Sequence, residues 1–146
     1  MNPLLKDFYP LTDEKILAIC IWGEARGEPF EAKLAVASVI KERVRRGGWY
    51  GKGYHGVILK DKQFSCFNPF DPNFIKMIDL VYNFDEENNK EKNKVVWECY
   101  KIAKGIITGN IKPNIVATNY LSIYCDVCWE NKLKKVATIG RHDFYI

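Results

Sequence analysis

The segment from Asp13 to Ala25 constrains the fold more than any other part of the sequence. Its central residues, Ile16–Trp22, are apolar nearly all round a helical wheel, whereas a helix at a protein surface keeps one polar face. Thr12 is a suitable N-cap, and Asp13 and Glu14 put acidic side chains in the first turn, where the helix dipole favours them. The sequence therefore predicts a buried helix around which the rest of the chain must pack.

The residues after this helix predict a chain reversal and a second helix. Gly27 is expected to close the first helix in a left-handed conformation, and Pro29 suits the first position of the next helix. The second helix is expected to run to Arg46, with one apolar face, and to end at Gly47-Gly48. Glu28, between the two helices, is interpreted as an N-terminal cap or dipole partner of the second helix.

The rest of the chain predicts two more helices and an irregular end. These helices are expected over Asn73–Asn83 and Glu91–Thr108, with Gly109 as the cap of the latter. The aromatic segments 117–124, 136–139 and 142–145 favour short strands or a hairpin. The expected fold class is mainly α (α+β), in one compact domain over residues 1–146 with a small irregular or β part at its C-terminal end.

Composition narrows the functional classes. Lys and Arg number 22 against 18 Asp and Glu, and this excess of four is too small for the basic stripe of a nucleic-acid-binding protein. The longest apolar run is shorter than the roughly 20 residues of a membrane span, and no secretory signal is visible at the N-terminus. We expect a monomer without a membrane anchor that stays in the cytoplasm of the cell that makes it.

The cysteines give little evidence of a disulfide framework or a metal site. They stand at positions 20, 66, 99, 125 and 128, and an odd, scattered set is not typical of a disulfide scaffold. Cys125 and Cys128 form a lone CxxC with no second pair and no histidine nearby, which is weak evidence for zinc. No metal and no other cofactor is expected.

Glu24 is the candidate catalytic residue. It lies four positions after Cys20 and eight after Ile16, so it projects from the apolar row of the first helix. Desolvation raises the pKa of a carboxylic acid and makes it a proton donor near neutral pH. Cleavage of a glycosidic bond needs such a donor at the leaving oxygen. The alternative interpretation of Glu24 is a surface glutamate near a helix end. Glu28 competes for the catalytic role, although its place off the helix favours the structural interpretation given above.

Three motifs, in order along the chain, resemble the spore-cortex-lytic type of cell-wall hydrolase. The first is Trp22–Glu31, which contains EARGE and runs into the alanine- and valine-rich segment 35–44. The others are GVIL at 56–59 with QFS at 63–65, and TIGRHDFY at 138–145. The chain departs from the family at Glu42-Arg43-Val44, where relatives usually have Asn-Arg-Val.

The resemblance implies a lysozyme-like fold and cleavage of the peptidoglycan glycan strand between N-acetylmuramic acid and N-acetylglucosamine. It also implies a single catalytic glutamate, which falls on Glu24. A hydrolase normally needs a second carboxylate, and Asp61, Asp71 and Asp79 are candidates with no compelling spacing. A lytic transglycosylase works with one carboxyl group, so we favour that reaction.

Polar and aromatic side chains supply the candidate contacts with substrate. Polar groups would bind acetamido groups and aromatic rings would pack on sugar faces, although the aromatic residues are equally suited to the core. The expected substrate-binding residues are Gln63, Phe64, Ser65, Asn119, Tyr120, Trp129 and His142. Of these, Asn119 and Tyr120 align with a segment in which relatives carry aromatic or histidine-rich variants.

Two other classes of function remain open. A peptidase or amidase of the wall peptide would pair Cys20 or Cys66 with His142, and a non-catalytic module would bind peptidoglycan without cutting it. Within the favoured class, the absence of a visible signal or anchoring repeat favours a phage endolysin held in the host cytoplasm until the membrane opens. An enzyme deposited during sporulation is the alternative.

Overall fold

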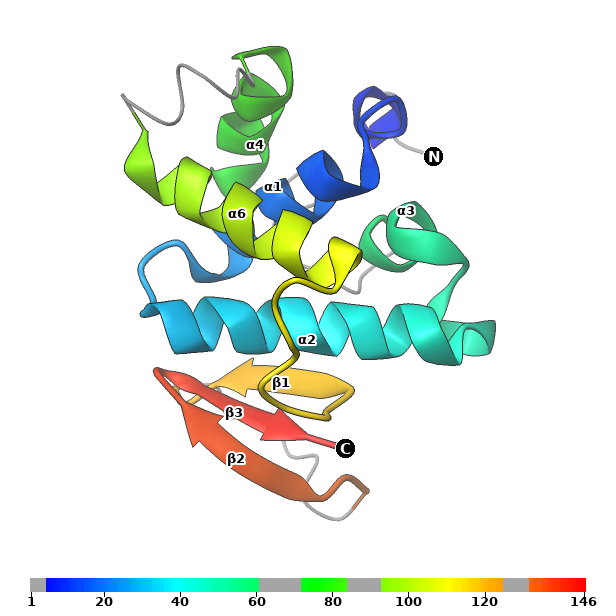
Figure 1. Cartoon of the computed structure of the whole chain (residues 1–146), viewed down its shortest axis with the longest axis vertical. Coiled ribbons are helices and arrows are strands. Elements are labelled where there is room, and N and C mark those ends of the chain that lie inside the picture. Colours follow the sequence, from blue (N-terminus) through cyan, green and yellow to red (C-terminus); the bar gives the residue numbers. More distant parts are fainter. Residues whose placement is uncertain (1–4, 61–71, 84–92, 125–131) are drawn as a thin grey trace.

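A long helix separates a layer of helices from a small sheet in the computed structural model of the chain (Figure 1). The structure describes residues 5–60, 72–83, 93–124 and 132–146. The long helix is α2 (Phe30–Arg46), and α1 (Asp13–Ala25) and α6 (Lys94–Thr108) pack together on one side of it. The three-stranded sheet contacts α2 from the other side.

The four helices that the sequence predicts are confirmed: α1 begins at the predicted residue, and the starts of the other three are shifted by one to three residues. The third is α4 (Pro72–Asn83), and the fourth, α6, begins at Lys94 after an Asn93 cap rather than at residue 91. Three short helical segments were not predicted: the 3-10 helices η1 (Leu5–Phe8) and η2 (Gly48–Tyr50), and α3 (Gly53–Ile58). Each is too short to carry a clear period of apolar residues.

The ends of α1 and α2 confirm two of the predicted caps and correct two other predictions. Pro29 is the N-cap of α2, which begins at Phe30, rather than the first residue of the helix. The hydroxyl of Thr12 accepts a hydrogen bond from the backbone N–H of Lys15 at 3.3 Å, as an N-cap does. Gly47 follows α2 with φ of 61°. The prediction of a left-handed cap at Gly27 is wrong, because the C-cap of α1 is Arg26, which has right-handed helical angles, and Gly27 has no positive φ.

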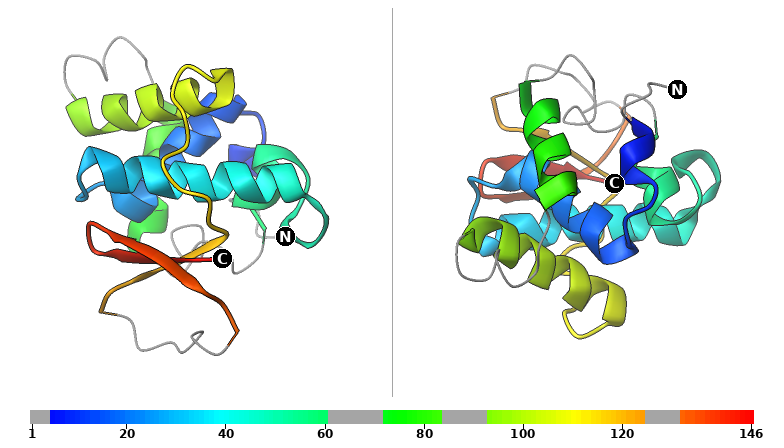
Figure 2. Two further views of the ribbon diagram at one scale, coloured as in Figure 1. Left: turned by 60° about the horizontal axis from the view of Figure 1, so that its bottom comes forward. Right: turned by 90° about the horizontal axis from the view of Figure 1, so that it is seen from above.

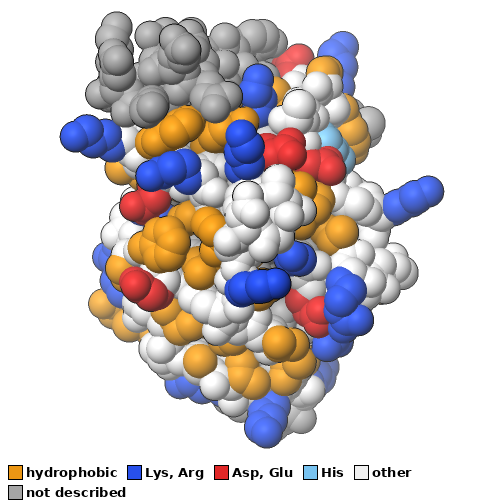
Figure 3. All heavy atoms as spheres, viewed as in Figure 1, with side chains coloured by type: hydrophobic (Ala, Val, Ile, Leu, Met, Phe, Trp, Pro, Cys, Tyr) orange, Lys and Arg blue, Asp and Glu red, His pale blue; other side chains and the backbone are white. Residues whose placement is uncertain are grey.

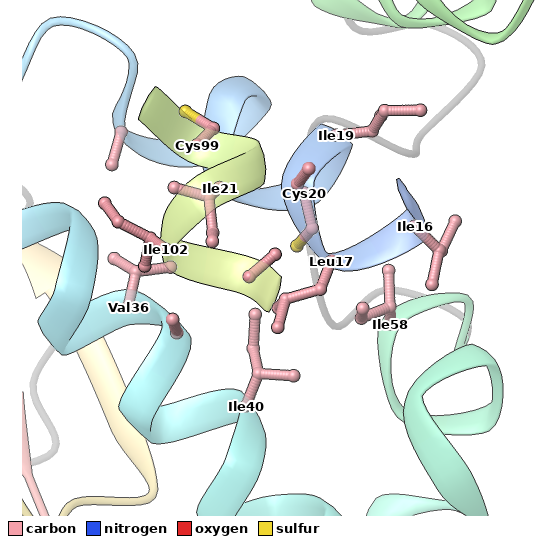
Figure 4. Close-up of a cluster of buried hydrophobic side chains, with 14 of the residues drawn as sticks. Ile16, Leu17, Ile19, Cys20, Ile21, Val36, Ile40, Ile58, Cys99 and Ile102 are labelled. Carbon is pink, nitrogen blue, oxygen red and sulfur yellow. The ribbon is translucent and has the colours of Figure 1, made fainter. Parts of the chain in front are cut away.

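Hydrophobic burial explains why α1 lies at the centre of the fold. Every residue from Ile16 to Ile21 is at most 1% exposed. Figure 4 shows these side chains among those of α2, α3 and α6, including Ile40, Ile58 and Ile102. Each large aliphatic side chain removed from water in this way contributes about 1.5–3 kcal/mol. The prediction of a buried helix is confirmed, and none of the described helices is long and apolar enough to cross a bilayer.

The C-terminal strands form an antiparallel sheet with β3 in the middle. Its strands are β1 (Asn119–Ser122), β2 (Lys135–Ile139) and β3 (His142–Tyr145), in the order β1-β3-β2. A two-residue turn, Gly140-Arg141, joins β2 to β3 and lies beside the loop between α1 and α2 (Figures 1 and 2). The prediction of a mainly α fold with a small C-terminal β part is therefore confirmed.

Candidate functional site

A pocket of about 430 Å³ opens where the end of α1 faces the sheet. Residues 23–28 line one side of it, and residues 122, 124, 141 and 142 line the other. The pocket therefore brings together two parts of the chain that are about a hundred residues apart in sequence.

Glu24 lies in this pocket and is held by the sheet. It is half-buried in the last turn of α1, and its Oε1 accepts a hydrogen bond from the hydroxyl of Tyr120 at 2.7 Å. The ring of Tyr120 packs edge-on against the ring of His142, with centroids 5.4 Å apart, and lies 5.8 Å from the ring of Phe144. Because β1 and β3 fix these rings, they also fix the hydroxyl group that meets Glu24.

A second carboxylate in the pocket, that of Glu28, holds the turn between β2 and β3. Its Oε1 accepts the backbone N–H of Arg141 at 2.9 Å, and its Oε2 accepts Nε–H of the same residue at 3.1 Å. Burial acts to raise the pKa of Glu28, but these hydrogen bonds and the charge of Arg141 outweigh it, so the pKa lies below its usual value. Glu28 is therefore ionised at neutral pH.

This placement changes the interpretation of Glu28. The N-cap of α2 is Pro29, and α2 has no side-chain hydrogen bond at its cap, so Glu28 does not serve as the predicted cap. It binds a turn 113 residues away instead. Two glycines make room for this contact. A Cβ on Gly140, which has φ of 59°, would stand 3.0 Å from Cβ of Ala32, and one on Gly27 would stand 3.3 Å from Nη2 of Arg141.

His142 contacts both Tyr120, the hydrogen-bond partner of Glu24, and the carboxylate of Glu28. Its Nδ1 is 3.0 Å from Oε1 of Glu28, close enough for an ion pair in the protonated form, but the ring makes no well-directed hydrogen bond from this nitrogen within the described residues. Burial lowers the pKa of His142, and the negative charge of Glu28 opposes that shift without reversing it. The ring is therefore neutral at pH 7 and serves as a wall for Tyr120.

The sequence interpretation missed Arg43, a buried cation behind the site. It is 5% exposed, and its Nε donates to the carbonyl oxygen of Thr118 at 2.7 Å, just before β1. Burial lowers the pKa of Arg43, and the groups whose charges oppose this include Tyr120 and Glu24, which places Arg43 near both. The available signal was its spacing, because Arg43 continues the buried row of Val36 and Ile40 on α2.

The remaining predicted residues are not brought into this pocket by the described part of the chain. Asn119 is half-buried at the start of β1, opposite Tyr145, and does not line the pocket. The substrate-binding candidates Gln63, Phe64, Ser65 and Trp129 lie outside the described residues. So do two of the candidate second carboxylates, Asp61 and Asp71, whereas Asp79 lies on α4, away from the pocket lining.

The cysteines of the described region are unsuited to nucleophilic chemistry. Cys20 is fully buried in α1, and burial raises the pKa of Cys99 to about 12. Cys66, Cys125 and Cys128 lie outside the described residues. Across residues 5–60, 72–83, 93–124 and 132–146, no group of three or more His, Cys, Asp or Glu side chains is arranged to hold a metal ion.

Comparison with known proteins identifies the family. Residues 27–145, most of the chain, match the family described as cell wall hydrolase. The chain belongs to this family. The matched region begins three residues after Glu24, and it contains Glu28, Tyr120, Arg141 and His142.

Individual relatives agree with this assignment. The spore cortex-lytic enzyme of Oceanobacillus iheyensis is 30% identical over 88 residues, which are 56% of this chain and 32% of that protein. The chain thus spans about a third of the length of this curated relative. The catalytic domain of the germination-specific lytic transglycosylase SleB from Bacillus anthracis has the same fold, with a TM-score of 0.65 and 23% identity over 92% of this chain and 93% of that one. The predicted family is therefore confirmed.

Proposed function

We propose that this cell wall hydrolase cuts the glycan strand of peptidoglycan between N-acetylmuramic acid and N-acetylglucosamine as a lytic transglycosylase, with Glu24 as general acid and base. The observation that carries the proposal is the hydrogen bond of 2.7 Å from Tyr120 to Glu24 at the wall of a pocket. A proton donor must keep a fixed position relative to the bond that it cleaves, and the tyrosine hydroxyl supplies that position.

The reaction requires one carboxyl group used twice. Protonated Glu24 gives its proton to the glycosidic oxygen as the bond from that oxygen to the anomeric carbon of muramic acid breaks. The resulting carboxylate then removes the proton of the muramic acid 6-hydroxyl, whose oxygen bonds to the anomeric carbon. No water is consumed, the product is a 1,6-anhydro sugar, and Glu24 ends protonated as it began.

The state of Glu28 supports the use of a single carboxylate. A hydrolase needs a second carboxylate that can activate water, and Glu28 lines the same pocket as Glu24. However, its side chain is only 6% exposed, and both of its oxygens already accept hydrogen bonds from Arg141. A carboxylate engaged in this way is poorly placed to take a proton from a water molecule.

The relatives support the same reaction class. The solved structure is named a lytic transglycosylase, and the curated relative is named a spore cortex-lytic enzyme. In this proposal, the hydroxyl group of Tyr120 positions the carboxyl group of Glu24, and His142 packs against the ring of Tyr120. Contacts with the sugar rings are assigned to the segments that contain Gln63, Phe64, Ser65 and Trp129.

Digestion of purified peptidoglycan by the wild type and by Glu24→Gln tests the proposal. Mass spectrometry should find soluble products one water lighter than ordinary muropeptides with the wild type and none with Glu24→Gln. Glu31→Gln is the matched control, because Glu31 is exposed in the first turn of α2 and is not among the residues lining the pocket. Reducing-end products would indicate a hydrolase. Cutting by Glu24→Gln at the wild-type rate would refute the role of Glu24.

The same digestion separates the remaining alternatives. A wall-binding module would sediment with sacculi and release no fragments. We further propose a role as a phage endolysin, and the choice of substrate tests it: an endolysin lyses vegetative sacculi, whereas an enzyme of sporulation prefers spore cortex.

A further inference from the structure

Arg141 is a fixed cation at the edge of the candidate active site. Its Nε donates to Glu28 Oε2 at 3.1 Å, and its Nη2 donates to the carbonyl oxygen of Gly27 at 3.3 Å. A guanidinium group has five N–H donors. Within the described residues Arg141 makes no other side-chain hydrogen bond, so three donors remain for a ligand.

In the ion pair of Arg141 and Glu28, the guanidinium group is the exposed member. Both residues line the pocket that contains Glu24, but the side chain of Arg141 is 57% exposed and that of Glu28 only 6%. The carboxylate lies beneath and the guanidinium lies outside, as an oriented donor group. Arg26 adds a second cation to the lining, with its guanidinium stacked 4.4 Å from the centre of the Trp22 ring.

The rest of the visible surface does not suggest a general attraction to anions. Figure 3 shows basic and acidic side chains interspersed over one face rather than gathered in a single stripe. On this face, attraction of an anion would therefore depend on individual groups rather than on a basic stripe.

We propose that Arg141, positioned by Glu28, binds a carboxylate of the muropeptide next to the bond that Glu24 cleaves. The inference rests on the proposed function and names the feature of the substrate that the site selects. A planar guanidinium matches a carboxylate in shape and charge, and prior fixing by Glu28 reduces the entropy lost on binding. Peptidoglycan offers such groups in two places: along the stem peptide, and on the lactyl group of muramic acid where the stem has been removed.

The expected effect is modest because the side chain is more than half exposed. An exposed charge pair in water changes a rate constant or an affinity by about two- to fivefold. The readout is therefore the ratio of kcat/KM between the wild type and Arg141→Gln, compared across matched substrates. A defect in folding or in the chemistry of Glu24 lowers this rate on every substrate alike, whereas loss of a carboxylate contact lowers it only where the carboxylate is present.

Three substrates are required. The first is intact sacculi, the second is the same sacculi with their carboxylates converted to amides by carbodiimide and ammonia, and the third is glycan strands stripped of stems by an amidase. We expect the ratio of wild type to Arg141→Gln to be about two- to fivefold higher on intact than on amidated sacculi. Lys104→Gln removes an exposed cation from α6, outside the pocket lining, and should give equal ratios on both.

The stripped strands identify the source of the carboxylate. A ratio on the stripped strands as high as on intact sacculi shows that the site also accepts the lactyl carboxylate that amidase digestion exposes, and a ratio as low as on amidated sacculi restricts the contact to carboxylates of the stem peptide. Equal ratios on intact and amidated sacculi overturn the inference while the proposed function stands. A wild-type protein that cuts none of the three substrates overturns both.

Arg141→Gln leaves the buried carboxylate of Glu28 without its cation, so this variant could fail to fold. A second variant keeps the test decisive in that case. Arg141→Lys keeps a cation beside that carboxylate but loses the planar fork, so it should also lose the preference for intact sacculi. The wild type alone must cut intact sacculi faster than amidated ones, and equal rates there would overturn the inference without any variant.

Discussion

Replacement of Glu28 by glutamine should loosen the contact between the sheet and the helices. Glutamine keeps one oxygen for the backbone N–H of Arg141, but its amide nitrogen would face Nε–H, so two donors meet. Hydrogen bonds to charged groups contribute about 1.5–3 kcal/mol each. Glu28 as a whole residue is 8% exposed, so water can replace little of the lost hydrogen bonding. We expect the free energy of unfolding to fall by about 2–3 kcal/mol and Tm by roughly 5–10 °C.

The pH dependence of this loss tests its electrostatic origin. The pKa of Glu28 is lowered on folding, because the hydrogen bonds and charge of Arg141 outweigh burial. A carboxyl group with a lowered pKa stabilises the fold above its unfolded pKa of about 4.5, and the stabilisation is lost as pH falls through the folded value. The gap in stability between the wild type and Glu28→Gln should therefore be full at pH 6–7 and shrink below about pH 4.5.

Urea unfolding of both proteins at several pH values supplies the measurement, with Glu31→Gln as the control for loss of one exposed carboxylate. A loss below about 0.5 kcal/mol at pH 7, which is the size of an ordinary surface substitution, would refute the reasoning. A gap that stays constant down to pH 3 would show that shape rather than charge holds the turn.

Three further variants probe neighbouring contacts. Tyr120→Phe removes the donor to Glu24 and should lower kcat about tenfold with little change in Tm; an unchanged kcat would contradict the positioning role. Gly140→Ala should cost at least about 1 kcal/mol in thermal or urea unfolding, because φ is 59° and the new Cβ would stand 3.0 Å from that of Ala32; wild-type stability would contradict this. Substitution of alanine for all cysteines, including Cys20 and Cys99, should leave glycan cleavage intact at temperatures where the variant is folded; loss of cleavage there would favour the peptidase alternative.

Local sequence patterns predicted the helices well because burial in this fold follows helical periodicity. The apolar run of Ile16–Ile21 describes α1 directly, since a helix that is apolar all round has no surface to give to solvent. Thr12 and Gly109 cap helix ends within one turn of themselves, so their roles could also be predicted from the local sequence. The short α3 and η2 were missed because six or three residues do not establish a period.

The site was harder to predict because its contacts join distant parts of the chain. Tyr120 meets Glu24 across 96 residues, and Arg141 meets Glu28 across 113. Local reasoning gave Glu28 the nearest available partner, the start of α2, and gave Gly27 the commonest role of a glycine after a helix. In the structure both residues accommodate Arg141, and no spacing within 22–31 indicates that.

The separation of Glu24 from Glu28 depends on where α1 ends. In a continuous helix, residues four apart share a face, and two carboxylates there would repel each other. The helix stops at Ala25, and the chain then turns through Gly27 and Pro29, so Glu28 leaves the axis of α1 and reaches the turn of the sheet. One carboxylate is thus fully engaged in holding the sheet, and the sheet in turn holds Tyr120 against the other. A motif with two glutamates therefore supplies one group for the proposed chemistry and one for the geometry on which that chemistry depends.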